Sequence, residues 1–212
     1  MPSLTQVNRL PAAELVLKTL LETASGGPLP AWDSVQNAVQ VRCVEAGGTV
    51  FLQDVVHPYV YAVRHGLLKL SYLGEDGEEW IKSFAHEGRF FASIAALGLP
   101  GRTSFMVTAL EPSTVEQVDY RVLTGLAAMH LPWSRALHAL TMAFAARKEQ
   151  RERELLTLGP EARYISFRDT DPELERRIAQ KDLARHLGLT PVGLNRIVRR
   201  VRRGLEGKGK GY

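Results

Sequence analysis

The sequence predicts an α+β fold, with an antiparallel β-barrel or jelly roll followed by a long helix and a helix-turn-helix. Short β-rich runs separated by glycine-containing turns fill residues 39–119, a pattern typical of compact antiparallel barrels. Residues 133–158 then continue for 26 positions without glycine or proline, as a long helix does. Two short amphipathic segments meet at Gly188, which predicts the helix-turn-helix.

The composition excludes several classes of protein. The chain has 212 residues, 24% of them charged and 45% hydrophobic, enough for one or two domains with buried cores. The only cysteine, Cys43, excludes an intrachain disulfide, a four-cysteine iron–sulfur cluster and a cysteine-rich zinc site. Because the chain has no membrane-spanning apolar run and no secretory signal in its first ten residues, we expect a cytoplasmic protein without a membrane partner.

The basic charge is concentrated near the end of the chain. Residues 173–212 hold eleven Lys and Arg against four Asp and Glu, a balance of +7, so the remaining residues carry −3 within the total of +4. Such an asymmetry favours an acidic partner for the basic segment, either nucleic acid or an anionic membrane. The alternative is a basic tail that is simply solvated.

The first two regions of the chain differ in the spacing of their apolar residues, which is helical in the first and strand-like in the second. Leucines in the segment after Glu14 predict a short helix, which Gly26-Gly27-Pro28 ends. Alternation in residues 39–44 places Cys43 with Val39 and Val41, as a small buried side chain. The predicted strands are residues 39–44, 49–53, 59–66, 67–73, 78–84, 103–110 and 113–120.

One small barrel cannot easily cover the apolar side of a helix as long as residues 133–158. Trp133, Leu137, Leu140 and Phe144 are spaced 4, 3 and 4 residues apart, as in the seam of a coiled coil. We therefore predict that this seam pairs with a second copy of the chain. Packing of the seam against the barrel of the same chain is the alternative. The predicted domains are residues 1–130, the dimerisation helix 131–158 and a DNA-binding domain 159–212.

The helix-turn-helix lies in residues 180–200. Leu183, Ala184 and Leu187 give its first helix an apolar face, and Gly188 permits a left-handed residue after that helix. Thr190 is suited to cap the second helix, with Pro191 at its first position. Such a second helix enters the DNA major groove by its N-terminal part.

The second helix has a polar and basic outer side. Leu194 and Ile197 turn inward, which leaves the intervening side chains for DNA. Arg196 is the predicted base-reading arginine, whereas Arg199 and Arg200 lie closer to the phosphates. The predicted DNA-binding residues are Gln180, Lys181, Thr190, Pro191, Val192, Asn195, Arg196, Arg199 and Arg200.

From about Val41 to Arg200 the chain resembles the Crp/Fnr family of bacterial transcription regulators. The resemblance rests on the glycine-separated strands and on the stretch from Ile178 to Ile197. It implies a β-roll like that of cyclic nucleotide-binding domains, a long dimerisation helix and a winged helix-turn-helix. It also implies a palindromic double-stranded DNA operator, a homodimer and RNA polymerase as a further partner. Thr190 and Arg196 match the family's recognition helix, but Pro191-Val192 replace the Arg-Glu pair of the cyclic-AMP-binding branch.

The effector region departs further from that branch. Ala92-Ser93-Ile94 replace a Gly-Glu-Leu triplet, so the ribose-binding carboxylate is missing, although Arg102-Thr103-Ser104 resemble the phosphate-binding part. Ser93, Arg102, Thr103 and Ser104 are therefore the candidate effector-pocket residues, while cyclic nucleotide is disfavoured. Haem is disfavoured because His57, His65 and His86 are scattered. No cofactor or metal is assigned.

These observations predict a homodimeric, sequence-specific DNA-binding transcription regulator whose β-roll senses an unidentified effector. The alternative is a small-molecule-sensing interaction module whose basic C-terminal domain binds RNA or another acidic partner. The sequence contains no P-loop, no GxGxxG and no paired metal-ligand motif, so we do not expect an enzyme.

Overall fold

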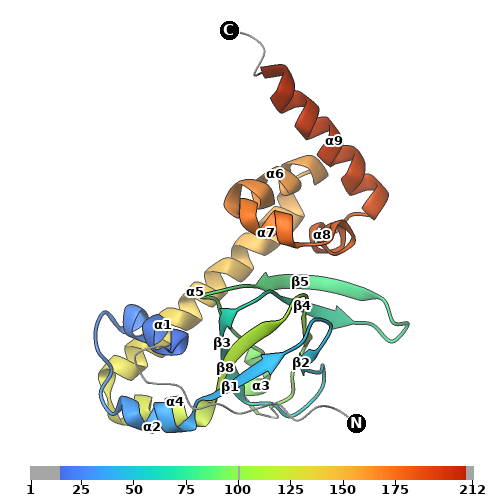
Figure 1. The fold of residues 1–212 in the computed structure, drawn as a ribbon. Helices are drawn as coiled ribbons and strands as arrows, with labels where there is room; N and C mark the ends of the chain where they lie inside the picture. The colour runs from blue at the N-terminus through green and yellow to red at the C-terminus, as the bar shows by residue number, and fades with distance from the viewer. Residues whose placement is uncertain (1–14, 100, 209–212) are drawn as a thin grey trace. The chain divides into compact units, whose positions relative to one another are not determined.

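The computed structural model describes residues 15–99 and 101–208 (Figure 1). Contacts divide the chain into two compact units. The first comprises residues up to Glu78 together with Lys82–Ala145, and the second comprises Glu79–Ile81 with the residues from Ala146 onward. The N-terminal ten residues, for which no secretory signal is predicted, lie outside the described residues. In the described part of the chain, no helix is both long enough and apolar enough to cross a membrane.

Two four-stranded sheets form the β-roll, defined here as residues 40–119. One sheet has the strand order β1-β8-β3-β6 and the other β2-β7-β4-β5. The registered pairs are antiparallel, as predicted. The strands are β1 (Gln40–Val44), β2 (Thr49–Phe51), β3 (Tyr59–His65), β4 (Leu68–Leu73), β5 (Glu79–Ala85), β6 (Phe90–Ala92), β7 (Met106–Ala109) and β8 (Ser113–Asp119).

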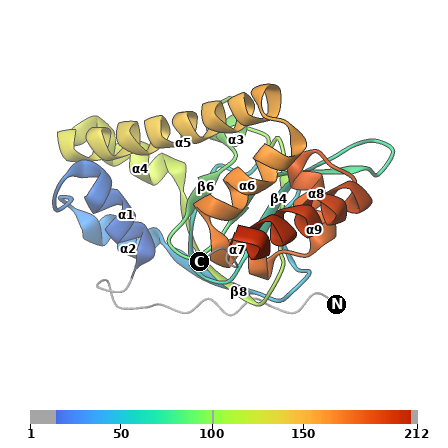
Figure 2. The ribbon, with the colours of Figure 1, turned by 90° about the horizontal axis from the view of Figure 1, so that it is seen from above.

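Helices flank the β-roll in sequence and make up most of the second unit. In the first unit they are α1 (Val16–Ser25), α2 (Trp32–Ala38), α3 (Ile94–Leu97) and α4 (Tyr120–Met129), and α5 (Leu131–Thr157) contributes residues to both units. The second unit adds α6 (Pro160–Thr170), α7 (Pro172–Arg177), α8 (Gln180–Leu187) and α9 (Pro191–Lys208). Figure 2 shows α6, α7, α8 and α9 gathered together.

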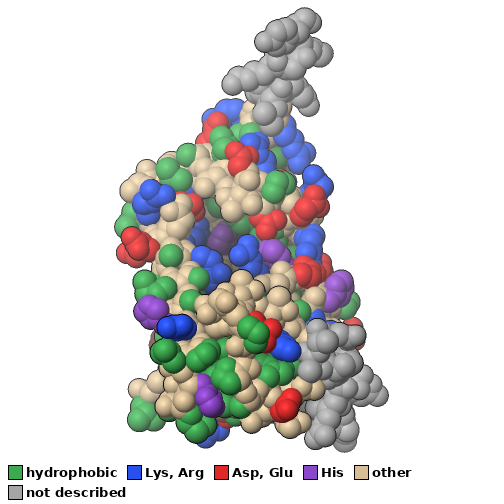
Figure 3. All heavy atoms as spheres, turned by 90° about the vertical axis from the view of Figure 1, so that its left-hand side faces the viewer, with side chains coloured by type: hydrophobic (Ala, Val, Ile, Leu, Met, Phe, Trp, Pro, Cys, Tyr) green, Lys and Arg blue, Asp and Glu red, His purple; other side chains and the backbone are tan. Residues whose placement is uncertain are grey.

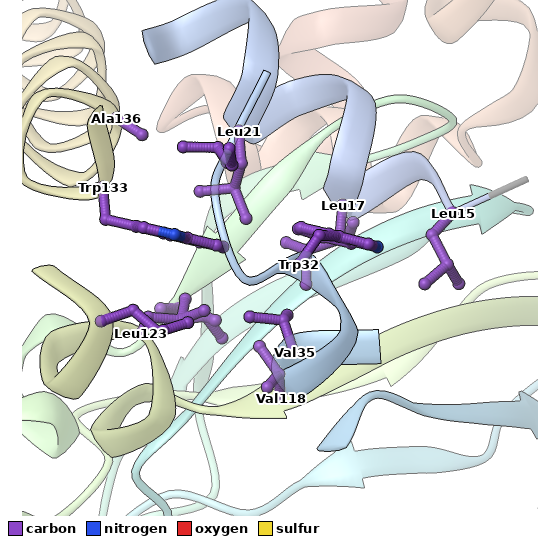
Figure 4. Packing of buried hydrophobic residues seen from close by; sticks show 14 of the residues in the cluster. Leu15, Leu17, Leu21, Trp32, Val35, Val118, Leu123, Trp133 and Ala136 are labelled. Atoms are coloured by element: carbon purple, nitrogen blue, oxygen red, sulfur yellow. The ribbon is translucent and has the colours of Figure 1, made fainter. Parts of the chain in front are cut away.

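Successive side chains of β3 belong alternately to two hydrophobic clusters. Val60 and Ala62 are fully buried against the helices, whereas Tyr61 and Val63 are fully buried between the two sheets. This period of two is what a strand buried on both faces requires. On the helical side, α1, α2, α4 and the start of α5 cover the sheet that contains β3 and β8 (Figure 4).

A buried carboxylate fixes the start of α1. Leu15, at the N-cap, provides no side-chain cap. Instead, Glu116 of β8 accepts hydrogen bonds from the backbone N–H groups of Val16 and Leu17, at 2.9 and 2.8 Å. Arg64 lies 3.3 Å from the same carboxylate. Burial raises the pKa of Glu116, against the opposing effect of these hydrogen bonds and of Arg64. Glu116 thereby ties the N-terminal helix to the sheet.

Several sequence predictions need correction. The predicted wing is wrong for the described residues, because α9 continues as a helix to Lys208 and residues 159–208 contain no strand. Cys43 is exposed rather than buried. Cys43 lies on the same face of the edge strand β1 as the buried Val41, but this face is open to solvent at the position of Cys43. The short elements α2, β6 and α3 were not predicted.

The predicted seam of the long helix packs largely within its own chain. Trp133 is fully buried, its ring stacks on Trp32 at a centroid distance of 5.9 Å, and its Nε1–H donates to the Pro30 carbonyl at 2.8 Å. Leu137 and Leu140 pack against the same cluster. Trp133 is therefore not available to a partner chain, and the prediction for this residue is wrong.

Candidate nucleic-acid interface and effector region

The turn between α8 and α9 has the geometry that its sequence predicts. Gly188 closes α8 in the left-handed region, with φ of 67°, where a residue without Cβ is favoured. Thr190 Oγ1 accepts a hydrogen bond from the Gly193 backbone N–H at 3.1 Å, which caps α9. Pro191 follows at the first helical position. These local contacts fix where α9 begins and which side chains occupy its first turn.

The inner sides of α8 and α9 are apolar and buried. Leu183, Ala184 and Leu187 on α8, and Leu194, Ile197 and Val198 on α9, are each less than 9% exposed. Tyr164 of α6 is also buried, and its hydroxyl donates to Glu175 at 2.8 Å. Burial and the neighbouring carboxylate raise the pKa of Tyr164 to about 12, so the phenol stays neutral. This packing determines which side of α9 faces outward.

The predicted DNA-binding side chains are all exposed. They are Gln180 and Lys181 at the start of α8, and Thr190, Pro191, Val192, Asn195, Arg196, Arg199 and Arg200 at the cap or along α9. Basic side chains are visible on the second unit in the space-filling view (Figure 3). Each of these side chains thus faces solvent, while their role in DNA binding stays a prediction.

The arginines of this surface differ in their partners. Arg200 forms an ion pair with Glu161 of α6. Among the side chains that the structure describes, Arg196 and Arg199 have no such carboxylate. Their guanidinium groups are therefore available to an external acceptor, whereas Arg200 first has to leave Glu161.

The candidate effector-pocket residues are hydrogen-bonded to other parts of the same chain. Ser93 is buried, and its hydroxyl accepts a hydrogen bond from the Ser104 backbone N–H at 3.0 Å. Thr103 Oγ1 donates to the Leu52 carbonyl at 2.6 Å and accepts from Val55 N–H at 3.1 Å. These hydrogen bonds close the loops at one end of the β-roll.

Arg102 lies at the surface and contacts a carboxylate. Its Nε is 2.7 Å from Asp54 Oδ1, and both side chains are at least half exposed. The guanidinium group holds the pKa of Asp54 below its usual range. Within the predicted set, Ser93 contacts Ser104. Arg102 binds Asp54, which was not predicted because 48 residues separate the partners and no local motif marks the pair.

Aromatic side chains occupy the space between the two sheets. Tyr61 stacks on Phe91 at 4.9 Å between ring centroids, and Phe51 contacts Tyr61 and Phe105 at 5.7 and 5.6 Å. His57 Nε2 is hydrogen-bonded to the Tyr61 hydroxyl. Burial, followed by the charge of Arg42, lowers the pKa of His57, which favours the neutral form of this histidine. Among the described residues, no group of three or more His, Cys, Asp or Glu side chains is placed to hold a metal ion.

The exposed side of α5 also carries apolar residues. Leu131, Met142 and Leu156 are 62%, 55% and 78% exposed. Phe144 of the predicted seam is partly buried, with Lys82 Nζ 5.2 Å from its ring centroid. The apolar surface that α5 offers to solvent is therefore not the predicted seam.

Comparison with known proteins agrees with this architecture. Residues 41–130 match the family model of the cyclic nucleotide-binding domain. No curated protein sequence matches the chain. Similar solved structures include FixK2 from Bradyrhizobium japonicum, with a TM-score of 0.66 and 21% identity over 78% of this chain and 85% of that chain.

Two further structures have the same arrangement. The c-di-GMP responsive global regulator CLP of Xanthomonas campestris has a TM-score of 0.63 and 16% identity over 79% of this chain and 88% of that chain. A CooA mutant from Carboxydothermus hydrogenoformans has a TM-score of 0.64 and 12% identity over 79% and 78% of the two chains. These structures share the fold of β-roll, long helix and C-terminal helices, so the predicted fold is confirmed.

Proposed function

We propose that this chain is a homodimeric transcription regulator that binds a specific sequence of double-stranded DNA through α9. The observation that carries the proposal is the capped, outward-facing N-terminal part of α9, where Arg196 is exposed and has no carboxylate partner among the described side chains. Arginine in the first turns of such a helix is suited to bind guanine through two hydrogen bonds. The fold of the chain, which is that of transcription regulators, supports the same function.

A dimer is required for a palindromic operator. Two recognition helices reach successive major grooves when a two-fold axis separates them by about 34 Å. We assign the dimer contact to the exposed apolar side of α5, which includes Leu131, Met142 and Leu156. The buried Trp133 then supports this helix from within its own chain. RNA polymerase is a further partner that the family resemblance suggests, and the cytoplasm is the expected compartment.

The β-roll would regulate DNA binding without cyclic nucleotide as its ligand. Two observations support this part of the proposal. Ser93, Thr103 and Ser104 already satisfy one another or nearby backbone groups, and Arg102 is engaged by Asp54. An effector of the β-roll acts only through a difference in its affinity for the DNA-binding and non-binding states of the dimer. We assign no haem, iron–sulfur cluster or catalytic activity to the chain.

Selection of bound duplexes from a random DNA pool tests the proposal. The expected result is a palindromic consensus whose half-sites lie one helical turn apart, together with a dimer in light scattering. Preferential binding of single-stranded RNA, or duplex binding without any consensus, would contradict it. Glutamate substitution of Met142 and Leu156 is expected to give folded monomers that lose the palindrome, whereas glutamate at the exposed Gln150 is the matched control on the same helix.

A further inference from the structure

The first turns of α9 carry an exposed apolar side chain where a basic surface would be expected. Val192 is 64% exposed, and it lies beside the exposed Asn195 and Arg196, three and four residues further along the helix. Residues at this spacing share one side of a helix. Val192 therefore forms, with Asn195 and Arg196, a surface of three different chemistries: an apolar side chain, an amide and a guanidinium.

Each of the three side chains favours a different base edge. Valine has no hydrogen-bonding group, so it suits the thymine methyl and leaves the amino group of cytosine without an acceptor. Asparagine is suited to bind adenine N6 and N7 with two hydrogen bonds, and arginine to bind guanine O6 and N7. Because Val192 is β-branched, its side chain is nearly fixed in a helix, and little conformational freedom is lost on contact.

The spacing places the contacts of Val192 and Asn195 on one or two neighbouring base pairs. A separation of three residues corresponds to about 4.5 Å along the helix axis, close to the rise of about 3.4 Å per base pair. The thymine methyl and the adenine N6 and N7 atoms lie on the same major-groove edge of an A·T pair. We propose that Val192 and Asn195 together read an A·T step in each half-site, next to a G·C pair read by Arg196.

The proposal rests on the proposed DNA-binding function and specifies its ligand. The test begins with the consensus selected by the unaltered protein. Each thymine of one half-site is then replaced by uracil, which removes only the methyl group, and each adenine by 7-deazaadenine, which removes only N7. Binding of the unaltered protein is expected to weaken about threefold at one uracil and about fivefold at one 7-deazaadenine, at the same or adjacent positions.

Two variants assign these losses to residues. The uracil effect is expected to vanish in Val192→Ser, and the 7-deazaadenine effect in Asn195→Ala, while each variant retains the other effect. Both side chains are exposed, and circular dichroism checks that the helices are retained. If a consensus is found but neither variant abolishes the effect assigned to it, this inference is overturned while the proposed function stands. Failure to recover any consensus would overturn both.

Discussion

The outward face of α9 and the candidate effector region use their polar groups in opposite ways. On α9, Asn195, Arg196 and Arg199 are exposed, and the two arginines have no carboxylate among the described side chains. In the β-roll, Ser93, Arg102 and Thr103 are each bonded to another part of the same chain. Polar groups that stay available can bind an external ligand, whereas satisfied ones stabilise the fold. The comparison indicates that the polar groups of α9 are available to an external ligand, whereas those at this end of the β-roll hold its loops together.

The largest expected effect is a loss of stability after substitution on the buried side of α5, compared with substitution on its exposed side. Trp133→Ala removes a fully buried ring that stacks on Trp32, so we expect the free energy of unfolding to fall by about 3–5 kcal/mol. Gln150→Ala, at an exposed side chain of the same helix outside the proposed dimer contact, is the matched control. Urea denaturation of the two variants measures the difference, and equal stability would show that Trp133 is not part of the core.

A second prediction concerns the buried Glu116. Its folded-state pKa is raised by burial, so the folded chain binds this proton more tightly than the unfolded chain does. The contribution to stability is therefore complete below the unfolded pKa and is lost as the pH rises through the folded pKa. Relative to Glu116→Gln, which does not titrate, the unaltered protein is expected to lose stability over that window. Denaturation curves from about pH 4 to pH 8 measure the difference, and a constant gap between the two proteins would contradict it.

Salt dependence distinguishes the two arginines at the centre of α9. Each phosphate contact contributes about one unit to the slope of log affinity against log salt. Because Arg200 is paired with Glu161, Arg199→Ala is expected to lower the slope by about one and Arg200→Ala by less. Titrations of one duplex at several salt concentrations provide the comparison. A larger loss for Arg200→Ala would mean that the pair with Glu161 opens on DNA.

The smallest effect is expected at Arg102. Its ion pair with Asp54 is exposed, and exposed pairs contribute little to stability. Arg102→Ala is expected to leave thermal unfolding essentially unchanged, and calorimetry with cyclic AMP is expected to detect no saturable binding to either protein. If the unaltered protein binds cyclic AMP with micromolar affinity and Arg102→Ala abolishes this binding, Arg102 is a phosphate ligand. The polar groups of the β-roll would then bind an external ligand, as those of α9 are proposed to do.

Local signals explain why the helix-turn-helix was predictable. Gly188, Thr190 and Pro191 each act within a few residues, and the alternation of buried and exposed positions on α9 follows directly from Leu194 and Ile197. The strands other than β6 and the limits of the long helix were predictable for the same reason.

Contacts between distant residues were not predictable from one sequence. Glu116 caps a helix about 100 positions earlier in the chain, and Trp133 donates to Pro30 across 103 positions. The heptad spacing of Trp133 to Phe144 fits a partner helix and an intrachain core equally well, so spacing alone could not choose between them. The wing followed from family resemblance alone, and helical spacing beyond Val198 prevailed over it.

The most direct test of the account is the ratio of operator affinity to scrambled-duplex affinity for the unaltered protein and for Arg196→Ala. We expect Arg196→Ala to lose about 1–3 kcal/mol of binding free energy per half-site on the operator, with a smaller loss on the scrambled duplex, so that the ratio falls. Arg199→Ala, which removes a predicted phosphate contact, is expected to weaken both duplexes about equally and to keep the ratio. An Arg196→Ala protein that retains the full ratio would contradict the assignment of sequence reading to α9.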